Sequence, residues 1–93
     1  MNNETLLMQN PDVILRENEP GGPMLFNPDN SEMRILNETG LAIWNLCLQP
    51  ISRKDLLSGI LDEYDYDDRT LVEADLDLFL QEMIQQGFIG TLC

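Results

Sequence analysis

The sequence predicts a small α+β domain in which three short antiparallel strands are followed by three helices, in the order βββααα. Two patterns lead to this prediction. In the first third of the chain, short apolar runs alternate with clusters of proline, glycine, asparagine and aspartate, as expected for strands joined by tight turns. In the rest of the chain, apolar residues recur at the spacing of amphipathic helices.

The predicted strands cover residues 13–16, 24–26 and 33–36. Turns at residues 20–23 (Pro-Gly-Gly-Pro) and 27–31 (Asn-Pro-Asp-Asn-Ser) separate them, because proline and glycine break regular structure and asparagine and aspartate bond to their own backbone. Two such turns predict an antiparallel meander. Three short strands cannot bury an apolar face alone, so helices must cover the sheet.

The predicted helices cover residues 38–48, 53–64 and 68–86. Asn37 is a typical N-cap for the first helix, and Gly87 is a typical residue just beyond the end of the last. The residues expected to face the core are Ile43, Trp44, Cys47, Leu56, Leu57, Ile60, Leu61, Tyr64, Val72, Leu76, Phe79, Leu80 and Met83.

Ninety-three residues make one domain at most. Residues 1–10 are expected to be a loosely held, flexible N-terminus, as chain ends commonly are, and residues 11–93 to be the folded domain. A helix pair beside a small sheet is the winged helix-turn-helix arrangement, here with the wing-like strands first.

The charge of the chain narrows the choice of partner. Seventeen Asp and Glu residues against five Lys and Arg give a formal net charge of −12. Such a surface repels nucleic acid and an anionic membrane, and it favours a basic peptide or protein. No histidine is present, which removes the commonest general base and metal ligand. We therefore expect no cofactor, no metal ion and no catalytic site.

The cysteines and the chain start predict the compartment. Cys47 lies within an apolar helical pattern and Cys93 ends the sequence, and both are interpreted as reduced thiols. The first residues lack the features of a signal peptide, and no apolar run is long enough to span a membrane. These features predict a cytoplasmic protein.

The order and spacing of three motifs resemble the PqqD-like family, the stand-alone recognition elements of ribosomal peptide modification. The motifs are Asn27-Pro28-Asp29, the run from Ile35 to Trp44, and the run from Val72 to Ile89. The resemblance implies a winged helix-turn-helix that binds the leader segment of a precursor peptide and has no active site of its own. It also implies a modifying enzyme as partner, often a radical-SAM protein. The acidic third helix and the insertion at residues 20–23 depart from the usual pattern and leave the modification system open.

The resemblance also implies where the leader binds: as an added strand along the third strand, beside a groove at the third helix. On this basis the expected peptide-binding residues are Met33, Arg34, Ile35, Leu36, Leu71, Asp75, Leu78 and Glu82. An edge strand offers unpaired N–H and C=O groups to an extended peptide, which supports this mode independently. A Leu78→Asp change is then expected to abolish leader binding at little cost in stability.

Residues 62–82 contain nine acidic residues and one base, Arg69. Two interpretations stay open: a solvated acidic face, or a docking patch for a basic partner whose binding weakens with salt. A calcium loop starting at Asp65 is a third interpretation, but Thr70 stands where such a loop needs glycine.

Other classes of function fit the sequence less well. An acidic carrier protein needs a serine directly after an aspartate at a helix start, and the chain has no Asp-Ser pair. A winged-helix regulator of DNA needs a basic cluster, which no predicted helix carries. An enzyme needs a nucleophile–base pair, which a chain without histidine and with Cys47 buried does not offer. A protein–protein interaction module of another kind remains an alternative.

Overall fold

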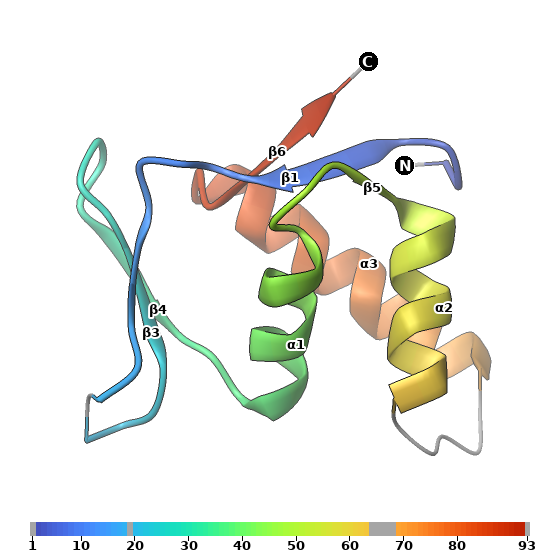
Figure 1. Ribbon diagram of the computed structural model, residues 1–93, viewed down its shortest axis with the longest axis horizontal. Coiled ribbons are helices and arrows are strands. Elements are labelled where there is room, and N and C mark those ends of the chain that lie inside the picture. The colour runs from blue at the N-terminus through green and yellow to red at the C-terminus, as the bar shows by residue number, and fades with distance from the viewer. Residues whose placement is uncertain (1, 19, 64–68, 93) are drawn as a thin grey trace.

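The protein, as a computed structural model, is described for residues 2–18, 20–63 and 69–92. It has a mixed α+β fold with three helices and six strands, which form two small antiparallel sheets (Figure 1). The elements in chain order are β1 (Leu6–Gln9), β2 (Ile14–Arg16), β3 (Met24–Asn27), β4 (Glu32–Ile35), α1 (Glu38–Leu46), β5 (Ile51–Ser52), α2 (Arg53–Glu63), α3 (Arg69–Gln85) and β6 (Ile89–Leu92).

The two sheets differ in how the chain builds them. The terminal sheet has the strand order β5–β1–β6, and the meander sheet has the order β2–β3–β4. In Figure 1 the terminal sheet runs across the top of the helices, while the meander sheet stands at one side of them, next to α1. The α+β prediction is confirmed, and the meander and the three helices begin and end within two residues of the predicted positions wherever the structure describes them.

The N-terminal segment differs from the sequence prediction, which placed residues 1–10 outside the folded domain. Residues 6–9 form the central strand of the terminal sheet, paired with β5 on one side and β6 on the other. Leu7 on this strand is fully buried. The prediction was wrong here because the partners of β1 come from the middle and the far end of the chain, and local sequence signals do not report such distant pairing.

The core lies where the helices meet the inner faces of both sheets. Most residues predicted to face the core are buried, Trp44 and Cys47 among them; Leu61 and Phe79 are half-buried, and Tyr64 lies outside the described residues. Phe88 and Ile89, directly after α3, are also buried. The buried apolar residues are Leu7, Leu25, Leu36, Ile43, Trp44, Cys47, Leu56, Leu57, Ile60, Val72, Leu76, Leu80, Met83, Phe88 and Ile89.

Arg53 joins three parts of the molecule at the start of α2. Its guanidinium donates to both carboxylate oxygens of Asp77 on α3, at 2.7 and 2.8 Å, and to the side-chain oxygen of Asn3 at 2.5 Å. The hydrogen bonds to Asp77 raise the pKa of Arg53 above its ordinary value. This nearly buried cation therefore ties the N-terminal segment to α2 and α3.

Candidate functional site

β4 is an edge strand, as the sequence predicted for the third strand of the meander. It pairs with β3, and no described strand lies on its other side. The Leu36 N–H donates to the Pro23 carbonyl at 2.7 Å, so Leu36 and, two residues earlier, Arg34 direct their main-chain groups toward β3. Because these directions alternate along an antiparallel ladder, the N–H and C=O groups of Met33 and Ile35 face the open edge.

Two adjoining hollows lie beside α3: the smaller next to β4, and the larger between α1, α2 and α3. The larger has a volume of about 600 Å³ and the smaller about 330 Å³, and both are lined by Asn37 and Phe79. The larger is otherwise lined by Thr39, Gly40, Ile43, Ile60, Leu71, Val72, Asp75 and Leu76. The smaller is otherwise lined by Gly21, Arg34, Ile35 and Leu36. Together they form a mostly apolar groove beside an open strand edge.

The structure brings together five of the eight predicted site residues. Arg34, Ile35 and Leu36 line the smaller hollow, and Leu71 and Asp75 line the larger. Met33, Leu78 and Glu82 line neither. On α3, Leu78 is 58% exposed and is turned further from the core than Asp75, because the helical repeat carries it about 60° farther round.

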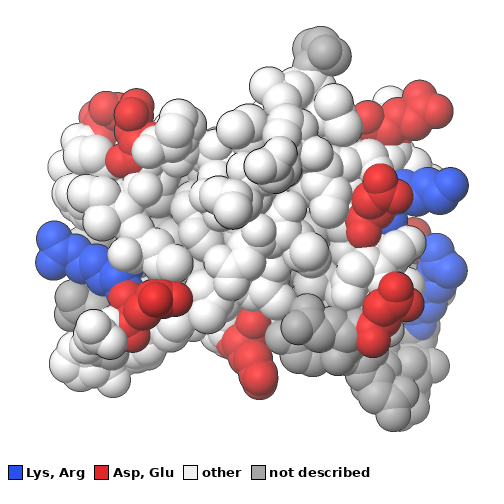
Figure 2. Space-filling view, in the orientation of Figure 1, with Lys and Arg blue, Asp and Glu red and all other residues white. Residues whose placement is uncertain are grey.

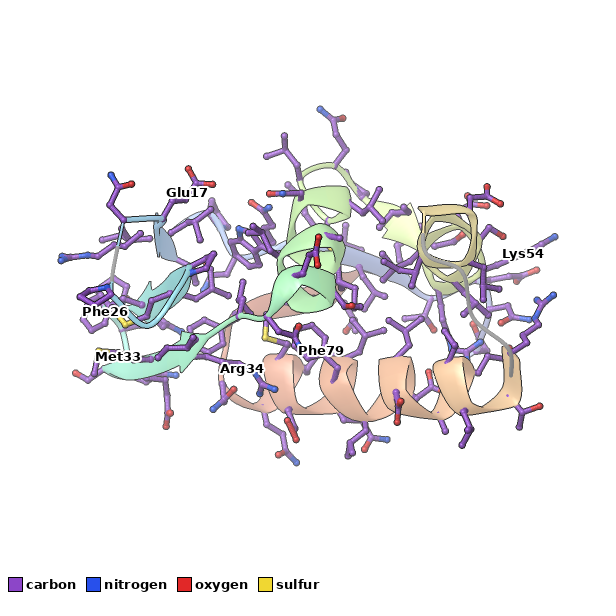
Figure 3. All side chains as sticks on the ribbon, turned by 90° about the horizontal axis from the view of Figure 1, so that it is seen from below. Glu17, Phe26, Met33, Arg34, Lys54 and Phe79 are labelled. Atoms are coloured by element: carbon purple, nitrogen blue, oxygen red, sulfur yellow. The ribbon has the colours of Figure 1, made fainter. Side chains whose placement is uncertain are left out.

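Arg34 connects the edge strand to α3. One guanidinium nitrogen lies 3.0 Å from a carboxylate oxygen of Glu82, and another donates to the side-chain oxygen of Gln86 at 3.1 Å. The guanidinium carbon also lies 4.9 Å from the centre of the Phe79 ring. Figure 3 shows Arg34 pointing from β4 toward α3, and Phe79 pointing from α3 toward the start of α1. Glu82 therefore takes part in the site through Arg34.

Two asparagines of the meander and one from the segment just before it bond to the end of α3. The side-chain amide of Asn27 donates to the carbonyls of Gln86 and Gly87 at 3.3 and 3.2 Å. Asn30 donates to Gln86 at 3.0 Å, and Asn10 donates to Gly87 at 2.9 Å. These amides satisfy carbonyls that the helix end leaves without partners. Gly87 has a φ of 78°, and a Cβ there would approach the Asn27 amide nitrogen to 2.6 Å, so glycine is required.

The sequence analysis placed Phe79 in the core and gave it no part in the groove. It is half-buried and lines both hollows. A helical wheel puts Phe79 at the edge of the core stripe nearest Asp75, and that position was the available signal. Gly40 also lines the larger hollow, where a Cβ would lie 3.1 Å from the Asn37 side-chain oxygen, a tight approach, and 3.4 Å from Phe79, an ordinary contact.

The described acids of residues 62–82 do not form one patch. Glu73 and Asp77 lie beside Arg53, and Glu82 pairs with Arg34. Several other acids of the region, and the calcium loop considered at Asp65, lie outside the described residues. On the face shown in Figure 2, charged side chains lie toward the periphery and the centre is uncharged.

A metal site and a membrane-spanning helix are both absent from the part of the chain that the structure describes. No three His, Cys, Asp or Glu side chains gather there as a possible metal site. No helix among the described residues is long and apolar enough to cross a membrane. Cys47 is a free, buried thiol, and its burial raises its pKa from 9.0 to about 12, which is opposite to the shift that activates a nucleophile.

Comparisons with known proteins agree with this geometry. No curated protein matches the sequence. The fold is similar to a solved structure described as "Lasso peptide synthetase B1 complexed with the leader peptide", with a TM-score of 0.72 and 21% sequence identity. That match covers 90% of this chain and 96% of the other. The family described as "Coenzyme PQQ synthesis protein D (PqqD)" matches residues 24–89, well over half of the chain and all of the groove residues except Gly21. The chain therefore belongs to the PqqD family.

Proposed function

We propose that this protein binds the leader segment of a ribosomally synthesised precursor peptide as a strand added along β4, and presents it to a modifying enzyme. The observation that carries the proposal is the open edge of β4 lying directly beside an apolar groove against α3. Membership of the PqqD family and the leader peptide bound to the similar lasso peptide synthetase B1 support it.

The edge and the groove supply different parts of the binding energy. The main-chain groups of Met33 and Ile35 pair with any extended peptide, because backbone hydrogen bonds do not depend on side chains. The hollows select among peptides, because only a suitable side chain fills the space between Leu71 and Phe79. Recognition needs no reacting group, and the protein acts as a carrier of the peptide and not as an enzyme.

Different side chains on α3 select for apolar and for charged side chains of the leader peptide. Leu71 and Phe79 contact an apolar leader side chain in the larger hollow, and Asp75 on its wall favours a basic or polar neighbour. Leu78 contacts the leader at the outer rim, and Glu82 acts mainly by holding Arg34. The enzyme that receives the leader is of the radical-SAM or another modifying class, and the complex forms in the cytoplasm, where precursor peptides are synthesised.

Two exposed leucines on α3 give a matched test of this site. A random dodecapeptide library displayed on phage is selected on the immobilised protein, and the most enriched peptide is titrated calorimetrically into three proteins. These are the wild type, Leu71→Asp and Leu78→Asp, whose substituted side chains are 62% and 58% exposed.

We expect Leu71→Asp to abolish binding, because it puts a charge into the apolar hollow. Leu78→Asp is expected to weaken binding less. Circular dichroism should show two folded variants, since neither leucine is buried. Equal affinities of wild type and Leu71→Asp would place the binding site elsewhere, and a library with no enriched peptide would refute peptide binding.

A further inference from the structure

The outer face of the meander sheet, which points away from the helices, is almost entirely apolar. Strand register places its residues in two rows that cross all three strands: Ile14, Phe26 and Met33 in one row, and Arg16, Met24 and Ile35 in the other. The alternate residues Leu15, Leu25 and Arg34 form the row that faces the helices. Figure 3 shows Phe26 and Met33 together on the side away from the helices, and Arg34 on the opposite side.

Exposure on this face is greatest at the open edge, where Ile35 also borders the smaller hollow. Met33 is 59% and Ile35 58% exposed, whereas Phe26 and Met24 on the central strand are half-buried by neighbours on both sides. The solvent face of a small antiparallel sheet is ordinarily polar. On β3, the side chains of both rows have a neighbouring strand on each side. On β4, Met33 and Ile35 have a described neighbouring strand on one side only, which leaves both side chains exposed.

We propose that Met33 and Ile35 are specificity residues for the outer side of the bound leader. The strand added along β4 carries apolar side chains at the two alternate positions that lie opposite them. The leader is then read on both faces: one set of side chains enters the groove, and an apolar-x-apolar pair extends the outer rows. This inference rests on the proposed function and adds a second determinant to it.

The backbone geometry favours the added strand as the occupant of these rows. The main-chain groups of Met33 and Ile35 face the open edge, so the residues that bond to them lie directly opposite, about 5.5 Å away at Cα in an antiparallel pair. Their side chains stand on the same face as Met33 and Ile35. The leader residue between them, opposite Arg34, points toward α3. One strand thus covers both exposed side chains while filling the groove.

A partner that docks on the face as a whole would treat the rows differently. Ile14 is 45% exposed on the same face, but it lies at the β2 edge, two strands from β4. A modifying enzyme or a second copy seated on the face would cover Ile14 together with Met33. An added strand covers Met33 and Ile35 and leaves Ile14 in solvent. Ile14 is therefore the matched control position.

The test selects a random dodecapeptide library on wild type, Met33→Lys, Ile35→Lys and the control Ile14→Lys. We expect wild type to enrich peptides with two apolar residues two positions apart, besides the residues that enter the groove. Peptides enriched on Met33→Lys should carry Asp or Glu in place of one of these apolar residues. Peptides enriched on Ile35→Lys should carry Asp or Glu in place of the other, two positions away. The wild-type peptide should bind either variant roughly two- to tenfold more weakly, the size of one to two cross-strand pairs. Ile14→Lys should match wild type.

The outcomes separate this inference from the proposed function. If the same peptide consensus is enriched on wild type, Met33→Lys and Ile35→Lys, the outer determinant is refuted and groove binding is left intact. A consensus that Ile14→Lys shifts as strongly as Met33→Lys would also refute it. So would sedimentation showing a wild-type dimer that Met33→Lys dissociates, because a second copy would then cover the face. No enrichment on the folded wild type would refute both proposals.

Discussion

The terminal sheet and the meander sheet each contain three antiparallel strands, but they are built from different distances along the chain. The terminal sheet joins residues 6–9, 51–52 and 89–92, whereas the meander sheet is formed by one continuous stretch, residues 14–35. The terminal sheet closes the fold around the fully buried Leu7. The meander keeps one edge open beside α3. Each sheet sends a fully buried leucine into the core, Leu7 from β1 and Leu25 from β3, so the two sheets differ mainly in the groove-side edge of β4, which the proposed function uses for binding.

The largest difference should appear between a buried position of the terminal sheet and an exposed position of the meander sheet. Leu7→Ala removes a fully buried side chain from β1 and should lower the free energy of unfolding by about 2–5 kcal/mol. Ile14→Ala on the exposed face of β2 should cost less than about 1 kcal/mol, because little apolar area is lost from the interior. Urea unfolding measures both. Similar losses from the two variants would remove the distinction.

Asn27 tests the link between the meander and α3. The residue is 2% exposed. Asn27→Ala removes the amide that donates to two carbonyls at the helix end and the oxygen that accepts from the Asp29 N–H. We expect a loss of about 1–3 kcal/mol, the range for a buried polar group that loses its partner. Asn30→Ala is the control, because Asn30 is exposed and makes one of these bonds. A larger loss for Asn30 than for Asn27 would contradict this assignment.

How much of the fold the sequence predicts depends on whether the paired strands are close together or far apart along the chain. The meander follows from turn residues between short apolar runs, and the helices follow from caps and periodicity, both of which are local signals. The terminal sheet could not be predicted in this way, since β5 has two residues and Leu6 pairs with Leu92. In the groove, the edge strand, Leu71 and Asp75 were predicted. Phe79 was missed because apolar periodicity does not separate a core residue from one that also lines a hollow.

Alkaline pH should lower the free energy of unfolding through Cys47, which bonds to β1 of the terminal sheet. The carbonyl of Cys47 accepts from the Gln9 N–H of β1 at 2.8 Å, and its thiol is fully buried. Burial raises the thiol pKa from 9.0 to about 12, so the folded state holds the proton more tightly than the unfolded state. This contribution to stability is complete below pH 9 and is lost as the pH rises from 9 to 12. At pH 10 the loss should be on the order of 1 kcal/mol.

The measurement compares urea unfolding at pH 7 and pH 10 for two proteins. Both carry Cys93→Ser so that a single thiol remains in the reference, and one also carries Cys47→Ala. Other titrating groups and the charge repulsion between carboxylates affect both proteins alike, so the difference between their pH dependences belongs to Cys47. Identical pH dependences would show that the thiol ionises in the folded protein as it does in the unfolded chain.

The smallest effect should come from the ion pair that spans the groove. Arg34 and Glu82 are both partly exposed, with side-chain exposures of 25% and 44%, so water and salt screen their attraction. A double-mutant cycle with Arg34→Gln and Glu82→Gln should give a coupling of about 0.2–1 kcal/mol in the free protein, falling further in 1 M salt. The same cycle on Arg53 and Asp77 is the reference, because Arg53 is nearly buried and bonds both carboxylate oxygens. We expect the reference coupling to be the larger and the less sensitive to salt. A groove pair coupled as strongly as the reference would mean that Arg34 supports the fold, and the meander edge would then be a structural element as well as a binding one.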